Sequence, residues 1–300
     1  MRAEDVMNFL VVAETPTLLA ASAKLGMSQP TLSKSIARLE RALGIALIER
    51  LPRGVALTEA GRAFLVHSRP AALGLREGVD AVREIRTGRA GTVRVGLGVG
   101  VPQMLVIEAL KPLLKDGSLS VEISGGMSNS LSKAVAAGEC DFAITSVMPA
   151  GLASVLWEPL YFDPMVPVAS ARHPMATLRR TSWEMLSRQT WVIPGTGTSV
   201  RAWCEQQFTT RGVPLPTQVI SMRDYSVTPE FGAGLDAISL TPRSFMRVHP
   251  KAQDFVAVRT PADWQSDRYV GLMRRTGGQL SPAAQRLVDR IQGGARAKFG

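Results

Sequence analysis

The chain contains few residues of the kinds that bind metals or form disulfides. Its 300 residues include two cysteines, Cys140 and Cys204, and three histidines. None of them lies at the spacing of zinc ligands to another, and two cysteines cannot build a disulfide framework. We therefore expect two buried structural thiols rather than a redox pair, no metal site and no cofactor.

Long apolar runs are also absent. No window approaches the ~18 uninterrupted apolar residues of a transmembrane helix. The N-terminal residues MRAED carry acids and no apolar segment of a secretion signal. The apolar share of 45% and the charged share of 20% are ordinary for a globular chain of about two domains. We expect a cytoplasmic protein without a membrane partner.

Common catalytic motifs are missing as well. The glycines at 96, 98 and 100 follow a strand-like run but do not form the G-x-G-x-x-G of dinucleotide sites. Residues 194–199 (PGTGTS) have no lysine for a P-loop, and neither G-x-S-x-G nor H-E-x-x-H occurs. We predict that the chain is not an enzyme. The alternative is an enzyme with an appended DNA-binding region, whose turnover would survive deletion of residues 1–58.

The formal charge has a basic excess. There are 35 Lys and Arg against 25 Asp and Glu, which gives a net charge of +10. Such a surface attracts polyanions, including DNA, RNA and anionic lipid. The excess is spread along the chain, so the residue pattern must distinguish among these partners.

Residues 1–58 predict a winged helix-turn-helix. Apolar residues recur at helical spacing over 6–13, Thr17 is suited to cap a second helix, and Ser28 is suited to cap a third that ends at Gly44. Residues 47–58 then predict two short strands around a Pro-Arg-Gly tip. Two helices joined by a tight turn and followed by a basic hairpin are typical of this DNA-binding fold.

The third helix has one apolar and one polar face. Leu32, Ile36, Leu39 and Leu43 form the stripe expected to be buried. Amides and cations near the start of such a helix can bond base edges in the major groove, and wing arginines can bind phosphates or enter the minor groove. A solvated face of a small helical domain is the alternative. The predicted DNA-binding residues are Gln29, Pro30, Thr31, Ser33, Lys34, Arg38, Arg50 and Arg53.

Three blocks in this region resemble the LysR-type transcriptional regulators. They are SQPTLS at 28–33, LERALG at 39–44 and LTEAG at 57–61, in the order and at the spacing of that family's DNA-binding domain. The chain departs from the family at 16–17, where Pro-Thr replaces the usual Gly-Ser, and at Ile48, where Phe is common. The resemblance implies a sequence-specific regulator that binds double-stranded DNA under the control of a small-molecule effector.

Residues 59–88 predict one long linker helix. Apolar residues at 7-residue spacing include Leu75, Val79 and Val82, which need a covering partner, and Pro70 is expected to kink the helix. Packing against its own domain is the alternative. The resemblance implies antiparallel pairing with a second subunit, hence a homodimer, a tetramer as a further expectation, and RNA polymerase as a candidate partner.

Residues 89–300 alternate strand-like and helix-like runs, which predicts an α/β effector domain of two halves joined by crossing strands. The βαβαβ order at 93–145 implies a parallel sheet. We expect one subdomain from about 92–162 and 267–300, and a second from about 163–266. The resemblance implies the fold of a periplasmic binding protein, with the effector in the cleft between the two halves.

Loops that follow the strands supply the candidate effector site. They lie at 99–102, 127–129, 145–146 and 196–199, where hydroxyls, glycine N–H groups and helix N-termini suit a small anion such as a carboxylate. Ordinary turn chemistry is the alternative for each loop, and a constitutive DNA-binding scaffold protein is the alternative for the whole. The predicted effector-binding residues are Val99, Gly100, Ser128, Asn129, Thr145, Thr196, Thr198, Ser199 and Arg201.

Overall fold

The computed structural model describes residues 1–52, 54–87, 91–115, 119–147, 155–223 and 228–299. The chain divides into two compact units, Met1–Thr87 and Gly88–Gly300. Each unit has its own hydrophobic core, so each is treated separately below.

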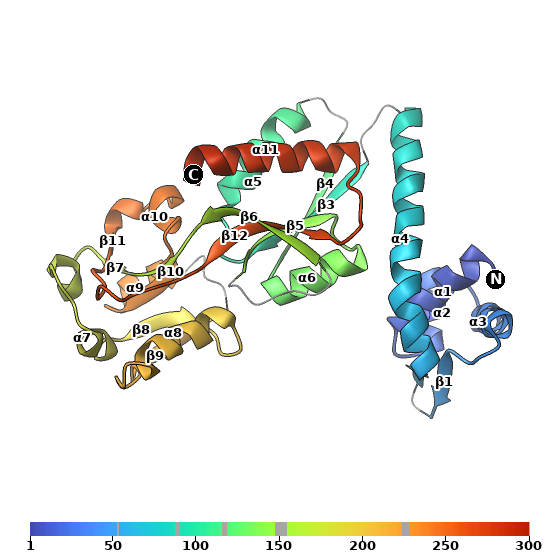
Figure 1. Cartoon of the computed structure of the whole chain (residues 1–300), viewed down its shortest axis with the longest axis horizontal. Coiled ribbons are helices and arrows are strands. Elements are labelled where there is room, and N and C mark those ends of the chain that lie inside the picture. The colour runs from blue at the N-terminus through green and yellow to red at the C-terminus, as the bar shows by residue number, and fades with distance from the viewer. Residues whose placement is uncertain (53, 88–90, 116–118, 148–154, 224–227, 300) are drawn as a thin grey trace. The chain divides into compact units, whose positions relative to one another are not determined.

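The first unit is a three-helix domain followed by a hairpin and a long helix (Figure 1). The strands of the hairpin pair antiparallel, with Arg50 opposite Val55. This arrangement confirms the predicted winged helix-turn-helix. The elements are α1 (Ala3–Ala13), α2 (Leu18–Leu25), α3 (Gln29–Leu43), β1 (Ile48–Leu51), β2 (Gly54–Leu57) and α4 (Glu59–Thr87).

The predicted caps are present. Thr17 accepts a hydrogen bond from the Ala20 N–H at 3.0 Å, and Ser28 accepts one from the Thr31 N–H at 3.4 Å. Gly44 ends α3 in the left-handed conformation, φ 72°, where glycine has no steric cost. Local sequence therefore defines both ends of α3.

The core of this unit follows the predicted stripe with one exception. Leu43 is 39% exposed, so its predicted burial is wrong. Leu43 is the last residue of the helix, and the returning chain brings Leu47 into the core in its place. The buried apolar residues are Phe9, Val12, Leu18, Ala21, Leu32, Ile36, Leu39 and Leu47.

The LTEAG block joins the hairpin to α4. The Thr58 hydroxyl donates to the Ala46 carbonyl at 2.8 Å and accepts from the Gly61 N–H at 2.9 Å, which caps the long helix. A Cβ at Gly61 would lie 2.0 Å from the Leu47 carbonyl oxygen. Only glycine fits there, because the backbone that precedes the wing passes directly over the first turn of α4.

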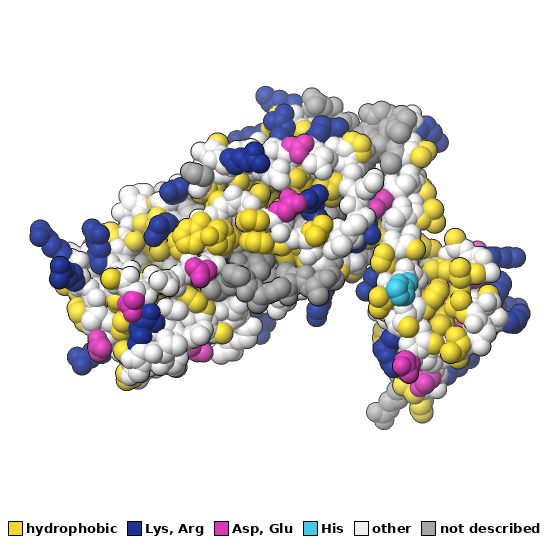
Figure 2. Space-filling model, in the orientation of Figure 1, with side chains coloured by type: hydrophobic (Ala, Val, Ile, Leu, Met, Phe, Trp, Pro, Cys, Tyr) yellow, Lys and Arg dark blue, Asp and Glu magenta, His cyan; other side chains and the backbone are white. Residues whose placement is uncertain are grey.

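The long helix continues through Pro70. Leu75, Val79 and Val82 are 57%, 44% and 65% exposed on it. Hydrophobic side chains are visible along its surface (Figure 2). Among the described residues these side chains have no apolar cover.

The second unit contains two five-stranded sheets with the strand orders β4-β3-β5-β12-β6 and β11-β7-β10-β8-β9. Strands β3, β4 and β5 are parallel, as predicted, and so are β8, β9 and β10. Both sheets are nevertheless mixed, because β12 runs antiparallel to β5 and β6, and β7 runs antiparallel to β10 and β11, which the alternation of strands and helices does not specify. The strands are β3 (Thr92–Gly98), β4 (Ser120–Gly126), β5 (Phe142–Val147), β6 (Val155–Phe162), β7 (Met165–Ser170), β8 (Trp191–Pro194), β9 (Val219–Met222), β10 (Ile238–Pro242), β11 (Phe255–Ala257) and β12 (Tyr269–Arg275).

Helices cover both faces of each sheet. In the first subdomain α5 and α11 pack on one face and α6 on the other (Figure 1). In the second, α7 and α8 pack on one face, and α9 and α10 on the other. The helices are α5 (Gln103–Leu114), α6 (Ser128–Ala137), α7 (Trp183–Ser187), α8 (Ser199–Thr209), α9 (Thr228–Gly234), α10 (Phe245–Val248) and α11 (Pro282–Phe299), with short 3₁₀ turns η1 (Pro174–Thr177) and η2 (Ala252–Asp254).

Two segments connect the sheets. Residues 163–164 lead from β6 to β7, and residues 258–268 lead from β11 back to β12. The strands that reverse direction, β7 and β12, are those that directly follow these crossovers. The mixed sheets are therefore a consequence of the chain passing twice between subdomains.

Gly61→Ala and Gly74→Ala form a matched pair within α4. The first places a Cβ against the Leu47 carbonyl and should lower the free energy of unfolding by ~1–3 kcal/mol. The second meets no atom within 4 Å and should raise it by ~0.5–1 kcal/mol through helix propensity. Urea titration of both variants measures the difference, and equal stabilities would contradict the close approach at Gly61.

Candidate DNA-binding and effector-binding sites

The start of α3 presents most of the predicted DNA-binding residues to solvent. Gln29, Pro30, Thr31 and Lys34 are exposed, and Ser33 is half-buried. The Thr31 and Ser28 hydroxyls lie 2.8 Å apart, so the cap also orients Thr31. Lys and Arg side chains project at the edge of this unit where α3 lies (Figure 2).

The hairpin of β1 and β2, which forms the wing, is bonded to α3 through Glu40. Its Oε1 accepts hydrogen bonds from the Leu47 and Ile48 N–H groups, at 2.8 and 3.1 Å. Arg50 is exposed on β1, while the predicted contact Arg53 lies outside the described residues. The glutamate of the LERALG block thus fixes where the basic hairpin begins relative to α3.

Arg38 makes more contacts within the protein than its position on the polar face of α3 predicted. Its Nε donates to Oδ2 and Oδ1 of Asp5, at 2.9 and 3.1 Å, and its Nη2 also bonds this carboxylate. The Asp5 side chain is fully buried, whereas that of Arg38 is 40% exposed. Arg38 therefore joins α3 to α1, and a phosphate contact by its exposed part stays a prediction.

The buried carboxylate of Asp5 belongs to a small polar network. Ser35 donates to Asp5 Oδ1 at 2.7 Å and accepts from Asn8 at 2.9 Å. Hydrogen bonds from Arg38 lower the pKa of Asp5 to about 2, against burial, which raises it. Asp5 is thus ionised at neutral pH and stabilises the α1–α3 contact by charge.

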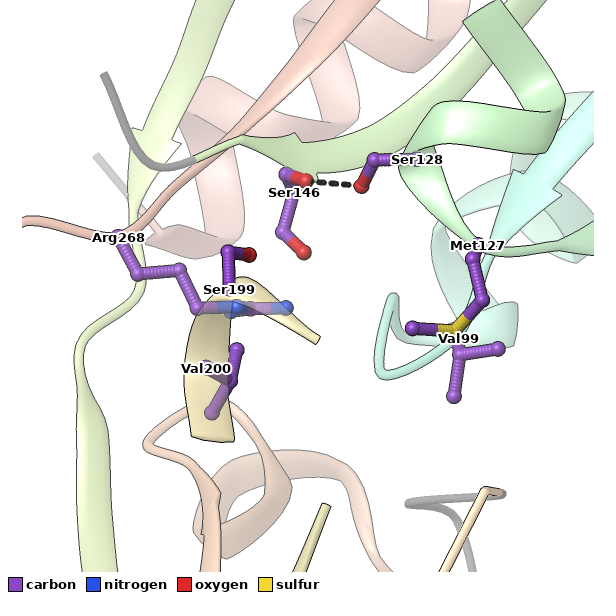
Figure 3. A pocket seen from close by; sticks show the side chains of 7 residues that line it. All are labelled: Val99, Met127, Ser128, Ser146, Ser199, Val200 and Arg268. Atoms are coloured by element: carbon purple, nitrogen blue, oxygen red, sulfur yellow. Dashed lines mark hydrogen bonds between the residues drawn. The ribbon is translucent and has the colours of Figure 1, made fainter. Parts of the chain in front are cut away.

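A pocket lies between the two subdomains of the second unit (Figure 3). The space open to the centre of a water molecule is about 30 Å³. The first subdomain contributes one wall, the second contributes another, and the crossover before β12 contributes one cation. The lining residues are Val99, Met127, Ser128, Ser146, Ser199, Val200 and Arg268.

Five of the predicted effector-binding residues lie in this pocket or next to it. Val99, Ser128 and Ser199 line it. Thr145 is buried behind Ser128, with the two hydroxyls 3.0 Å apart. The Gly100 carbonyl accepts a hydrogen bond from Arg268 at 3.3 Å.

The other four do not line the pocket. Asn129 and Thr196 are exposed, and Thr198 caps α8 by accepting from the Arg201 N–H at 3.1 Å. Arg201 turns to Glu205, 2.5 Å away, and to Ser221. The loops were predicted from the ends of strands, and three of their predicted residues line the pocket. Position along the chain does not predict which way each side chain points.

Sequence reasoning missed Val200 and Arg268 as lining residues. Met127 and Ser146 belong to predicted loops, whereas Arg268 belongs to none of them. Its only sequence signal is its place directly before β12, at the predicted return to the first subdomain. It is the one cation among the described residues that line the pocket.

Comparison with known protein families decides the identity of the chain. Residues 4–62 match the bacterial regulatory helix-turn-helix protein, lysR family, and residues 86–296 match the LysR substrate binding domain. The chain belongs to the LysR family of transcriptional regulators. It is a DNA-binding regulator with an effector-binding domain, as the resemblance implied.

Individual LysR-family proteins are similar along the whole chain. The regulator GbpR of Azospirillum brasilense is 26% identical over 100% of this chain and 88% of its own length. Full-length LysG from Corynebacterium glutamicum, with bound effector Arg, shares the fold with a TM-score of 0.67 at 15% identity, covering 100% and 99% of the two chains. Full-length CbnR in complex with its target DNA gives 0.59 at 19% identity, covering 98% and 100%.

The cysteines of this LysR-family chain are buried in different subdomains. Cys140 follows α6 and Cys204 lies within α8. Burial raises the pKa of the Cys204 thiol to about 12 and also raises that of Cys140. Both thiols are thus poor nucleophiles at neutral pH, which favours the structural role.

Across the described ranges of the chain, no cluster of three or more His, Cys, Asp or Glu is placed to hold a metal ion. None of the helices in these ranges is both long and apolar enough to cross a bilayer.

Asp5→Asn should weaken the α1–α3 contact. At neutral pH we expect a loss of ~1–3 kcal/mol in the free energy of unfolding, because the charge-assisted bonds to Arg38 are lost. The low pKa of Asp5 means that its contribution is full above its ordinary value of 3.8 and is lost as the pH falls toward 2. Stability curves of wild type and variant should therefore converge over this interval.

Glu4→Gln is the matched control for this pH series. Glu4 is the exposed neighbour of Asp5 on the same helix, so its loss should change stability by less than ~0.5 kcal/mol. Parallel curves for wild type and Asp5→Asn down to pH 2 would show that the carboxylate does not stabilise the fold by charge.

Proposed function

We propose that this LysR-family regulator binds operator DNA as a homodimer, and that a small anionic effector in the inter-subdomain pocket changes this binding. The observation that carries the DNA part is the exposed polar start of α3 in a winged helix-turn-helix. A helix with this end free fits the major groove, where its first residues reach base edges. A duplex complex has been solved for CbnR, which has the same fold.

The roles of individual DNA-binding residues follow from side-chain chemistry. Gln29 is suited to pair with adenine and Lys34 with guanine. The Thr31 methyl is suited to touch a thymine methyl. Ser33 and Pro30 lie beside these residues at the start of α3. Arg50, Arg53 and the exposed part of Arg38 supply charge for the phosphates.

The pocket suits an anion because donors converge on it. Ser128 and Ser199 are the first residues of α6 and α8, whose N-terminal N–H groups carry partial positive charge. No side chain caps α6. Together with the Arg268 guanidinium, these groups support a small ligand bearing a carboxylate.

Effector binding can act on DNA through rotation of the subdomains. The pocket has walls on both halves, so a ligand that contacts both favours one relative orientation. The linker helices of a dimer then change the spacing or angle of the two DNA-binding domains. Coupling of ~1–3 kcal/mol is typical of such regulators. Cytoplasmic location and contact with RNA polymerase belong to the same proposal.

Selection of genomic fragments by the full chain tests the function as a whole. Selected fragments should bind with a steep salt dependence, and a metabolite panel should include a compound that changes their footprint. A footprint that no compound alters would favour the constitutive scaffold protein, and turnover that survives deletion of residues 1–58 would favour an enzyme.

Gln29→Ala and Arg50→Ala should affect DNA binding differently. The first should cost ~1–3 kcal/mol on the preferred site and little elsewhere, which relaxes sequence preference. The second should weaken binding to all sequences alike and reduce the slope of log affinity against log salt concentration by about one. Fluorescence anisotropy over a salt series separates the two effects. Unchanged preference in Gln29→Ala would move base recognition to other residues.

Val79→Asp should disrupt the proposed dimer. It places a charge on the exposed apolar face of α4 formed with Leu75 and Val82, where a partner helix would pack. Val66→Asp is the control, since Val66 is 67% exposed on the opposite side of this helix. Sedimentation should show a dimer for wild type and control and dissociation for Val79→Asp. A wild-type 32.3 kDa monomer at micromolar concentration would refute dimerisation.

A further inference from the structure

An ion pair joins the two segments that pass between the subdomains. Arg268 precedes β12 and Asp163 follows β6, and each is only 1% exposed. Nη1 of Arg268 donates to Oδ2 of Asp163 at 2.7 Å and to its backbone carbonyl at 3.0 Å. The Asp163 N–H donates in return to the Arg268 carbonyl at 3.0 Å. The pair therefore fixes the crossovers against each other.

The two ends of this pair differ in how firmly they are bonded. Both Asp163 oxygens also accept from Ser244 of the second subdomain, through its N–H and its hydroxyl, each at 2.8 Å. At the other end, Nη2 of Arg268 has only a long bond of 3.3 Å to the Gly100 carbonyl of the first subdomain. The Asp163 carboxylate is thus held by three hydrogen bonds, while Nη2 is weakly held at the pocket.

Figure 3 shows the Arg268 side chain reaching the space beside Ser199, with Ser146 nearby. No hydrogen bond of the Ser146 or Ser199 hydroxyl is formed within the described part of the chain. These three groups are donors on one side of the pocket. Val99 and Met127 lie together on the other side, and Val200 lies below Ser199 (Figure 3).

Charge limits the ligand to one negative group. Asp163 already neutralises Arg268, and the other described lining residues are uncharged. The charge of one carboxylate is therefore met by donor groups alone, namely Nη2, the hydroxyls and the helix N-terminal N–H groups. A second negative group would add another buried charge with no cation to pair it, which is costly. A single carboxylate receives the Nη2 donor and the hydroxyls without displacing Asp163.

The enclosed volume and the apolar lining favour a small ligand. The enclosed space of about 30 Å³ exceeds the ~10–15 Å³ that one buried water needs by the same measure. Val99, Met127 and Val200 favour a short hydrocarbon rather than a second polar group.

We propose that the pocket binds a short-chain aliphatic monocarboxylate, with its carboxylate on Arg268 Nη2 and its hydrocarbon against Val99, Met127 and Val200. Arg268 is the specificity-determining residue. The carboxylate replaces the Gly100 carbonyl as partner of Nη2, which frees the loop between β3 and α5 from the crossover. This inference rests on the proposed function and narrows its effector class.

Calorimetric titration of the full chain with sodium propionate tests the ligand class. Propionamide has the same shape without the charge, and succinate adds a second carboxylate, all at matched ionic strength. We expect propionate to bind and the other two to bind more weakly by about tenfold or more. Absence of propionate binding, or equal binding of propionamide or succinate, would overturn the proposal.

Arg268→Lys tests the residue. Lysine keeps the charge beside Asp163 but lacks the second nitrogen, so propionate affinity should fall by about tenfold. Arg201→Lys is the matched control on α8, outside the pocket, and should leave affinity unchanged. Ser199→Ala removes a donor without touching the ion pair and should also weaken binding if Arg268→Lys fails to fold. Equal weakening in Arg201→Lys, or unchanged affinity in Ser199→Ala, would count against the proposal.

Footprints on selected DNA distinguish failure of the monocarboxylate proposal from failure of the proposed regulatory function. If propionate does not bind but another metabolite changes the footprint, the monocarboxylate is wrong and the regulatory function stands. If no compound changes the footprint, the effector function itself is wrong.

Discussion

The effector-binding unit depends on the two crossovers between its sheets, which the Asp163–Arg268 pair holds together. The two strands that run antiparallel to both neighbours, β7 and β12, each come directly after one of these crossovers. The pocket lies between the two halves that the crossovers join. A buried ion pair is weak evidence for stability by itself, but removal of one partner leaves a buried charge and costs ~3–5 kcal/mol. The pair therefore specifies one arrangement of the crossovers more than it strengthens the fold.

The DNA-binding unit also contains a buried carboxylate paired with an arginine that joins two distant segments. Asp5 and Arg38 are 33 residues apart and join the first helix to the recognition helix. In both pairs the carboxylate is fully buried and bonded to additional donors, while the arginine reaches a surface where a ligand is proposed: the duplex for Arg38 and the pocket for Arg268. A fixed carboxylate orients a long side chain that would otherwise sample many rotamers.

The candidate sites were only partly predictable because position along an element differs from direction in space. Loops after strands correctly located three pocket residues, since parallel strands bring their ends to one edge. Arg201 satisfied the same rule, yet it turns to Glu205 on its own helix. Arg268 is distant in sequence from every predicted loop, and only the return of β12 brings it to the pocket.

The sequence alone determined the family, the winged helix-turn-helix and the ends of α3. These depend on local signals, such as the Ser28 cap, the glycine at 44 and the LTEAG block, whose bonds join residues close along the chain. Tertiary structure decided the direction of β12 and β7, the burial of Leu47 in place of Leu43, and the partners of Arg38, Arg201 and Arg268. Most of these outcomes depend on contacts between distant segments, and no periodicity in a single segment encodes them.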